Sequence, residues 1–444
     1  MTHETTEPTP KAILVAVPTP DVSNSELETL LTELGGLAET LGFEVVDKIH
    51  QRRRSIAGGT VLGEGKLREL AQRTGGSGVI TRTFAKTNKA ALKRAPAPDP
   101  SPAQEPAEQI HVVIFDCELS PSQMSNLQRA LGVEILDRTG VIVEIFSRHA
   151  HTREARLQVE MARLKYTAPR TRAVGSDSSR MNRAGESAIE LEKRKIRDRI
   201  SELQDELAEV QKEQAAGRSL RSEENCVALV GYTNAGKSSL MRALTGSQVL
   251  VANKLFATLD TTVRTMHPAT VPPILVSDTV GFIRRLPHDL VASFRSTLEE
   301  AKSARLLLYV LDGSDPAFRD HLAVTREVLT SIGAHQIPSR LVINKCDRLS
   351  QSQIEELRSD FSDALLLSAI NSEDMVFLHS KIRDYFESRM EECEIVVPYA
   401  KQKAVGSLRN IARVMEECHG EEGTTLLVRA SRADLSSWKK ANGV

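Results

Sequence analysis

The chain has 444 residues, with 58 Lys and Arg against 59 Asp and Glu, so its net charge of −1 by itself points to no charged partner. This length exceeds what one hydrophobic core usually organises, and we expect two to four domains. The five cysteines are scattered without C-x-x-C spacing, which argues against a disulfide framework or a structural zinc site. The longest strongly apolar stretch, Leu306 to Leu311, is far too short for a membrane span, so we expect a cytoplasmic protein.

Residues 1–147 are predicted to form an amino-terminal α/β domain. Ala12 to Val17 has the pattern of a strand, the leucines from Leu27 to Leu37 recur at helical spacing, and His111 to Phe115 has the pattern of a second strand. Residues 84–109 are predicted to be an exposed insertion, because the part from 95 onward (APAPDPSPAQEPAEQ) is rich in proline, alanine and acids.

Residues 148–222 are predicted to form a charged helical hairpin or coiled coil. Helices are expected at 152–165 and 190–210, the second with an apolar seam of Leu191, Ile196, Ile200, Leu203, Leu207 and Val210. Between Arg148 and Arg199 there are fourteen Lys or Arg against seven Asp or Glu. Two interpretations stay open: a solvated helix face, or a patch for a polyanion such as RNA.

Residues 223–390 alternate apolar strands with helical segments, which indicates a mostly parallel sheet with helices on both faces. The expected strands are Cys226–Val230, Ile274–Ser277, Leu306–Leu311, Leu341–Asn344 and Ala364–Leu367. Residues 391–444 are predicted to form a small α+β carboxyl-terminal domain, with a helix near Val405–Glu417 and a strand at Thr424–Ala430. The chain as a whole is therefore expected to be an α/β multidomain protein.

The sequence GYTNAGKS at 231–238 is a phosphate-binding loop pattern, G-x-x-x-x-G-K-S. It follows the strand at 226–230 and precedes a helical segment from Ser239, an arrangement that aims amide groups and a helix dipole at phosphate. We expect Lys237 to reach the β- and γ-phosphates and the Ser238 hydroxyl to bind Mg²⁺. The chain is thus predicted to bind a nucleoside triphosphate.

Two downstream segments are predicted to complete the phosphate site. Thr258, in FATLD (256–260), is our choice for a second magnesium ligand, with Thr261 and Thr262 as rivals. The strand at 274–277 ends in DTVG (278–281), where Asp278 can hold a magnesium-bound water and the Gly281 amide can meet the γ-phosphate.

The segment NKCD (344–347) predicts guanine as the base. A carboxylate at Asp347 can accept from both N1–H and the N2 amine of guanine, whereas adenine offers neither donor. Ser368-Ala369 follows the next expected strand, and a backbone amide there is expected to meet the guanine carbonyl. The phosphate loop, the two downstream segments and these two base-binding segments together predict GTP.

The residues that we expect around the nucleotide are Gly231, Tyr232, Thr233, Asn234, Ala235, Gly236, Lys237, Ser238, Ser239, Phe256, Ala257, Thr258, Leu259, Asp260, Asp278, Thr279, Val280, Gly281, Asn344, Lys345, Cys346, Asp347, Ser368, Ala369 and Ile370. Lys237, Thr258 and Gly281 are assigned to catalysis, and Ser238 and Thr258 to the metal.

Phe282 stands where Ras-like enzymes carry the glutamine that orients the attacking water. Phenylalanine offers that water no hydrogen bond, so we predict slow hydrolysis that a macromolecular partner accelerates. Asn234 either ligates a monovalent cation such as K⁺ near the β–γ bridge or only stabilises the loop.

The chain resembles HflX-type ribosome-associated GTPases over nearly its whole length. The resemblance rests on the nucleotide motifs and on GEGKLREL (63–70), ELSPSQMSNLQ (118–128), DRTGVIVEIF (137–146) and TREARLQVEMARLKY (152–166). NRAGESAIELEKR (182–194) departs from the family's usual pattern there, and Thr261 replaces a usual proline. The resemblance implies binding to the large (50S) ribosomal subunit and its RNA, with splitting or rescue of stalled ribosomes.

Two other classes of function remain as alternatives. One is a P-loop ATPase or small-molecule kinase, against which NKCD argues. The other is an RNA- or ribosome-binding scaffold in which the nucleotide is mainly structural, an alternative that Phe282 keeps open. The chain is expected to act as a monomer.

Overall fold

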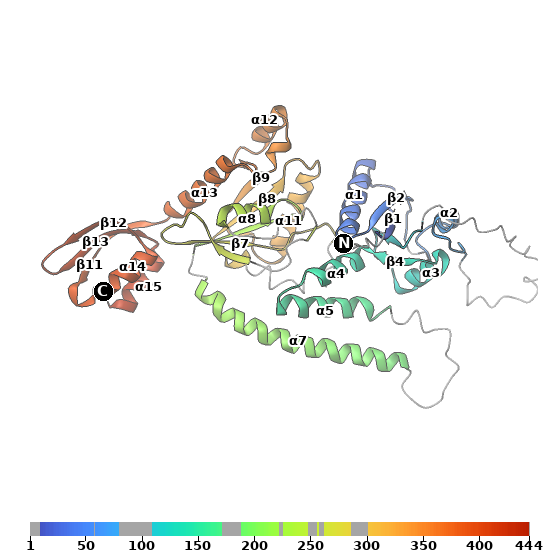
Figure 1. Cartoon of the computed structure of the whole chain (residues 1–444), viewed down its shortest axis with the longest axis horizontal. Coiled ribbons are helices and arrows are strands. Elements are labelled where there is room, and N and C mark those ends of the chain that lie inside the picture. The colour runs from blue at the N-terminus through green and yellow to red at the C-terminus, as the bar shows by residue number, and fades with distance from the viewer. Residues whose placement is uncertain are drawn as a thin grey trace, which may run out of the picture. The chain divides into compact units, whose positions relative to one another are not determined.

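The computed structural model describes residues 9–56, 58–79, 109–170, 188–221, 225–246, 255–256, 262–285 and 301–443 (Figure 1). The chain divides into two compact units. The first comprises Met1–Arg148 and Val159–Gln204, and the second His149–Gln158 and Asp205–Val444. Among the described helices, none is long and apolar enough to cross a bilayer.

A four-stranded parallel sheet forms the centre of the first unit, in the order β2-β1-β3-β4. Its strands are β1 (Lys11–Ala16), β2 (Glu44–His50), β3 (Val112–Phe115) and β4 (Glu134–Asp137). The helices that accompany it are α1 (Asn24–Thr40), α2 (Glu64–Thr74), α3 (Pro121–Leu131) and α4 (Arg138–His149). The expected strands and helix of an amino-terminal α/β domain are present. The insertion predicted at 84–109 lies outside the described residues except for its last position.

The sequence of α3 shows why these helices begin and end where they do. Ser120 accepts from the Gln123 amide and the Gln123 side chain accepts from the Ser120 amide, which is a complete capping box. Pro121 occupies the first turn, and Gly132 ends the helix with a φ of 71°.

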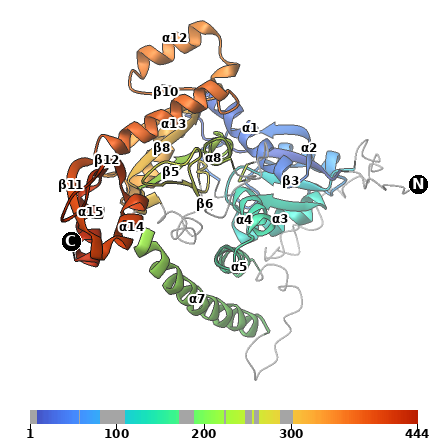
Figure 2. The same cartoon turned by 60° about the vertical axis from the view of Figure 1, so that its left-hand side comes forward.

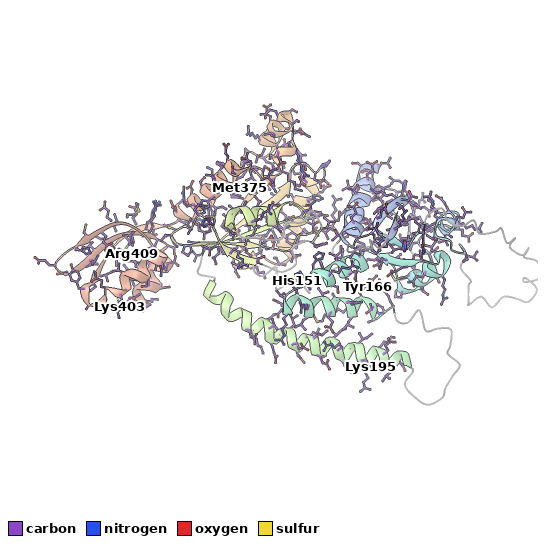
Figure 3. The ribbon with its side chains drawn as sticks, in the orientation of Figure 1. His151, Tyr166, Lys195, Met375, Lys403 and Arg409 are labelled. Carbon is purple, nitrogen blue, oxygen red and sulfur yellow. The ribbon has the colours of Figure 1, made fainter. Side chains whose placement is uncertain are left out.

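Two charged helices follow, α5 (Arg153–Thr167) and α7 (Ala188–Arg221). Arg199 Nε donates to Glu160 Oε1 at 3.0 Å, an ion pair that joins them. Of the predicted apolar seam, Leu203 and Val210 are buried, whereas Leu191 is 44% exposed, so the seam is not buried along its whole length. Charged side chains such as Lys195 project from α7 (Figure 3). Of the divergent segment 182–194, residues 182–187 lie outside the described residues, and the remainder from Ala188 onward forms the start of α7.

A six-stranded sheet forms the centre of the second unit, in the order β10-β9-β8-β5-β7-β6. Every pairing is parallel except that of β6 with β7. The strands are β5 (Asn225–Gly231), β6 (Thr262–Thr265), β7 (Ile274–Asp278), β8 (Leu306–Asp312), β9 (Ser339–Asn344) and β10 (Leu365–Leu366). The helices include α8 (Lys237–Thr245), α11 (Phe318–Ser331), α12 (Gln351–Asp360) and α13 (Ser372–Glu387).

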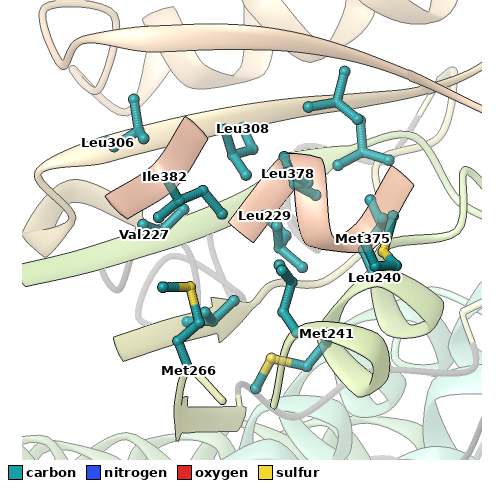
Figure 4. Packing of buried hydrophobic residues seen from close by; sticks show 14 of the residues in the cluster. Val227, Leu229, Leu240, Met241, Met266, Leu306, Leu308, Met375, Leu378 and Ile382 are labelled. Carbon is teal, nitrogen blue, oxygen red and sulfur yellow. The ribbon is translucent and has the colours of Figure 1, made fainter. Parts of the chain in front are cut away.

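Strand β5 is buried on both faces because its side chains alternate between two hydrophobic clusters. Val227 and Leu229 pack with residues of α8 and α13, as Figure 4 shows, and Figure 2 shows these two helices beside the sheet. Ala228 and Val230 pack on the opposite face, in a cluster that includes Leu329 of α11. The predicted sheet with helices on both faces is confirmed.

The carboxyl-terminal part is a three-stranded antiparallel sheet in the order β11-β13-β12, with two helices packed against it. Its elements are β11 (Glu391–Pro398), α14 (Lys403–Ile411), β12 (Arg413–His419), β13 (Gly423–Ala430) and α15 (Arg432–Asn442). The helix predicted near Val405–Glu417 is wrong beyond Ile411. Ala412 is extended, and the following residues pair with β13, because cross-strand pairing overrides a continuous helical pattern.

Candidate active site

The phosphate loop connects the end of β5 with the start of α8. Gly231 is required because a Cβ there would lie 2.2 Å from the Val310 carbonyl oxygen on β8. Gly236 is required for two reasons: its φ is 94°, and a Cβ would lie 2.1 Å from Asn344 Nδ2. The loop therefore packs directly against the ends of the neighbouring strands, and α8 begins at Lys237 with its amide groups facing the loop.

Lys237 is only 6% exposed, and its ammonium group is hydrogen-bonded to the first residues of the same loop. The Nζ atom donates to the carbonyl oxygens of Gly231 at 3.1 Å and Tyr232 at 2.8 Å. Burial lowers the pKa of Lys237 to about 8, against the opposing effect of the Asp278 carboxylate. Thr233 Oγ1 is also buried and has no hydrogen-bond partner among the described residues. An anionic ligand here would satisfy both groups.

Two oxygen ligands suited to Mg²⁺ lie together beside the loop. Ser238 Oγ donates to Asp278 Oδ2 at 2.7 Å, where Asp278 is fully buried at the end of β7. A hydroxyl next to a carboxylate is the hard oxygen chemistry that Mg²⁺ prefers, so the residues present fit this ion. Thr258 lies outside the described residues, as do Ala257, Leu259 and Asp260, whereas Phe256 is buried.

Residues 281–284, which we name the switch segment, lie against the phosphate loop. Phe282 N donates to the Gly231 carbonyl at 3.1 Å, and Thr233 N donates to the Phe282 carbonyl at 2.8 Å. The Phe282 side chain is 2% exposed and belongs to the hydrophobic cluster that holds Val230 and Leu307. Phe282 is therefore an anchor in the core.

Asn344 joins three parts of the site from the end of β9. Its Nδ2 donates to the Ala235 carbonyl of the phosphate loop at 2.9 Å, and its Oδ1 accepts from the Ala369 amide at 3.0 Å. Lys345, which has a φ of 62°, adds a second connection, because its Nζ donates to the Asn234 carbonyl at 2.8 Å.

Asp347 lies at an open pocket whose lining includes Cys346, Ser368 and Ile370. Its Oδ1 accepts from Ser368 Oγ at 2.5 Å. The amides of Ser368 and Ala369, where a contact with the guanine carbonyl was expected, donate within the protein to Asp374 and Asn344 respectively. The next residue, Ile370, is 80% exposed, and its amide has no backbone acceptor among the described residues.

Two supporting carboxylates were not among the predicted site residues. Asp312 pairs with Lys345 Nζ at 2.7 Å, and Asp374 accepts from the Ser368 amide at 2.7 Å. Asp312 is the last residue of the apolar strand β8 and pairs with Asn344 of β9. Its position at the end of a buried strand is the feature of the sequence that could have predicted its place in the site. Asp374 lies in the first turn of α13. Acidic residues are common there because they interact favourably with the helix dipole, so the sequence alone does not mark Asp374 as a site residue.

The phosphate loop, the hydroxyl–carboxylate pair and the Asn344–Asp347 segment meet at the carboxyl ends of β5, β7 and β9, and together they define a P-loop GTPase. Three family models match the chain: "50S ribosome-binding GTPase" at 226–345, "GTP-binding GTPase Middle Region" at 149–221, and "GTP-binding GTPase N-terminal" at 28–86 and 103–147.

Similar proteins identify the family. GTPase HflX of Gluconacetobacter diazotrophicus is 53% identical over 449 residues, covering 99% of each chain. GTPase HflX of Caldanaerobacter subterraneus subsp. tengcongensis is 37% identical over 424 residues, covering 94% of this chain and 90% of that protein. The crystal structure of an SsGBP and GDP complex aligns with a TM-score of 0.47 at 23% identity, covering 85% of this chain and 98% of that one. The chain belongs to the HflX family of GTPases.

Proposed function

We propose that this GTPase acts as a nucleotide-dependent factor on the large ribosomal subunit, where it separates or rescues stalled ribosomes. The observation that carries the proposal is the meeting of the phosphate loop, the Ser238–Asp278 pair and the Asn344–Asp347 segment at one edge of a sheet, in a chain whose family models include a 50S ribosome-binding GTPase. We further infer that the protein works in the cytoplasm as a monomer, in line with a ribosomal partner.

The residues divide the work on GTP as follows. Lys237 and the loop amides neutralise and orient the phosphates, and Asp347 selects guanine by accepting from its N1–H and N2 amine. Ser238 would hold Mg²⁺, with Asp278 beside it, and Mg²⁺ would neutralise charge on the β- and γ-phosphate oxygens. The Gly281 amide is assigned to the γ-phosphate, and Thr258 to the metal in the GTP-bound form.

The attacking water has no side chain to orient it at position 282. Phe282 is buried in the core, so it cannot swing toward the phosphates without opening a hydrophobic cluster. Turnover should therefore be slow until the ribosome, or an ion, supplies the missing stabilisation. Asn234 is an exposed residue of the phosphate loop, and we propose that it ligates K⁺ when that ion is present.

The helices α5 and α7 supply a candidate surface for ribosomal RNA. Their region carries twice as many basic as acidic residues between Arg148 and Arg199. Lysine and arginine at such density neutralise RNA phosphates, with an affinity that falls as salt rises. Within this region Arg199 also pairs with Glu160 of α5.

Cosedimentation with purified 50S subunits tests the proposal. The chain should pellet with 50S in the presence of a non-hydrolysable GTP analogue and much less with GDP. Cosedimentation that is equal with both nucleotides would contradict a nucleotide-dependent factor. Absence of binding with either nucleotide at low salt would contradict the ribosomal partner itself.

A further inference from the structure

A groove of about 810 Å³, which we name the α13 groove, lies next to the guanine pocket within the second unit. Ile370 and Asn371 line both the groove and the guanine pocket. One wall of the groove is α13, and the other comprises the end of α8 and the loop of residues 267–271 between β6 and β7. His379 Nε2 donates to the Pro268 carbonyl oxygen at 3.0 Å, so α13 and this loop are held together along the groove.

Helix α13 has two different faces because its sequence carries two stripes at helical spacing. Met375, Leu378 and Ile382 are buried and pack with the residues of the sheet, as Figure 4 shows. The second stripe, at positions 372, 376, 379, 383 and 387, lines the groove. These positions span about 22 Å along the helix. The groove is therefore long enough to hold about four turns of a second helix.

One part of the groove is apolar and exposed. Val271, Ile370 and Val376 line it and are 47%, 80% and 71% exposed, respectively. Leu244 and Met375 line the same groove and are buried. Large apolar side chains that are exposed to water and gathered in one groove mark an interaction site. This part therefore fits apolar side chains of a partner.

Another part of the groove is basic. Arg383 of α13 and Arg413, the first residue of β12, line it together with a single acidic residue among the described lining, Glu387. Arg413 Nη1 donates to Glu387 Oε1 at 3.2 Å, and Arg383 Nε lies 3.8 Å from the same oxygen. Arg383 Nη2 also donates to Asp384 at 3.4 Å, outside the groove lining. Exposed pairs of this kind are weak, so both guanidinium groups can pair with an acidic side chain of a partner.

We propose that the α13 groove binds an amphipathic helix of a protein of the large ribosomal subunit, with apolar side chains on the apolar part and an acidic side chain on the basic part. Side chains of two helices and a loop line the groove, and such a surface suits a helix whose residues at i, i+4 and i+7 point one way. RNA fits less well, because the described lining holds no Phe, Tyr or Trp on which bases could stack. The inference rests on the ribosomal partner proposed above.

The variants Val376→Lys and Val271→Lys each place an ammonium group in the apolar part, on opposite walls of the groove. Cosedimentation of the full chain with purified 50S subunits and a non-hydrolysable GTP analogue measures their effect, at about 200 mM salt, where contacts to RNA phosphates contribute less. Each variant should bind about tenfold more weakly, because the partner helix would bury an unpaired charge. Arg383→Glu should weaken binding by a similar factor, through repulsion of the acidic side chain. The GDP affinity and the GTP hydrolysis without ribosomes should match those of the parent chain in all three variants.

Phe377→Lys is a matched control, because Phe377 follows Val376 on α13, is 45% exposed and does not line the groove. Its affinity for 50S should stay within about twofold of that of the parent chain. The photocrosslinker p-benzoylphenylalanine, placed at Val376, should label a ribosomal protein.

Unchanged binding of Val376→Lys and Val271→Lys would overturn the proposal. Tighter binding of these variants, or a crosslink from position 376 to ribosomal RNA alone, would overturn it as well and indicate an RNA site. Failure of the parent chain to pellet with 50S would instead contradict the ribosomal partner itself.

Discussion

Replacing Asn344 by alanine should destabilise the nucleotide domain even without a bound nucleotide. The buried side chain connects the Ala235 carbonyl and the Ala369 amide through hydrogen bonds of 2.9 and 3.0 Å. Each bond contributes about 1 kcal/mol net, and each backbone group left buried and unpaired costs about 1 kcal/mol or more. The expected loss is therefore about 2–4 kcal/mol.

Thermal unfolding of the full chain measures this effect. For a domain of this size, 1 kcal/mol corresponds to about 2–4 °C in Tm, so Asn344→Ala should lower the transition of the nucleotide domain by roughly 5–15 °C. The affinity for GDP should fall as well, by up to about a hundredfold, because binding must then also order the loops that Asn344 connects.

Asn371→Ala provides a matched control, since Asn371 caps α13 by accepting from the Glu373 amide but does not reach the phosphate loop. Loss of a cap costs about 1 kcal/mol, so its Tm should fall by only about 2–4 °C with GDP affinity nearly unchanged. If Asn344→Ala melts within a degree or two of the parent chain, the reasoning that Asn344 joins the site is refuted.

Four further predictions address the base, the metal, the monovalent ion and the buried histidine. Asp347→Asn should weaken GDP binding at least a hundredfold and favour xanthosine diphosphate, as competition titrations would show; unchanged preference would place the base elsewhere. Ser238→Ala should abolish most of the stimulation of GTP hydrolysis by Mg²⁺, and a full response to Mg²⁺ would exclude Ser238 as a ligand. GTP hydrolysis should be faster in K⁺ than in Na⁺, and Asn234→Ala should remove this difference. Identical rates of the parent chain in both salts would contradict a role for Asn234 as a K⁺ ligand. Burial lowers the pKa of His321 below its ordinary 6.5, so the unfolded chain binds this proton at a higher pH than the folded chain does. The Tm should therefore fall as the pH drops through about 6.5, and the Tm of His321→Phe should depend less on pH. The same dependence of Tm on pH in both proteins would contradict this prediction.

The centre of the nucleotide site could be predicted from the sequence because its chemistry follows buried strands. Strands β5, β7 and β9 contain short apolar runs, and each ends at or just before residues that we assign to the phosphates, the metal or the base. Parallel strands bring such ends to one edge of the sheet. The sequence pattern around Lys237, Asp278 and Asn344 therefore predicts the positions that these residues have in the sheet.

Contacts between distant segments could not be predicted in the same way. The stack of Tyr232 on His321 and the pairing of Lys345 with Asp312 depend on the register of neighbouring strands and the placement of α11, which composition does not encode. The helix predicted at 405–417 was too long for the same reason, because residues 413–419 pair with β13, a contact between segments that a local helical pattern does not reveal. The hydrogen bonds from the Ser368 and Ala369 amides to Asp374 and Asn344 also could not be predicted, because they join separate segments of the chain.

The central claim is that this GTPase binds and hydrolyses GTP but depends on the large ribosomal subunit for efficient hydrolysis. Multiple-turnover phosphate release from GTP, measured with and without purified 50S subunits at saturating Mg²⁺, tests it directly. We predict slow release by the chain alone and stimulation of at least tenfold by 50S, with no stimulation by 30S subunits. Equal rates with and without 50S would contradict the account.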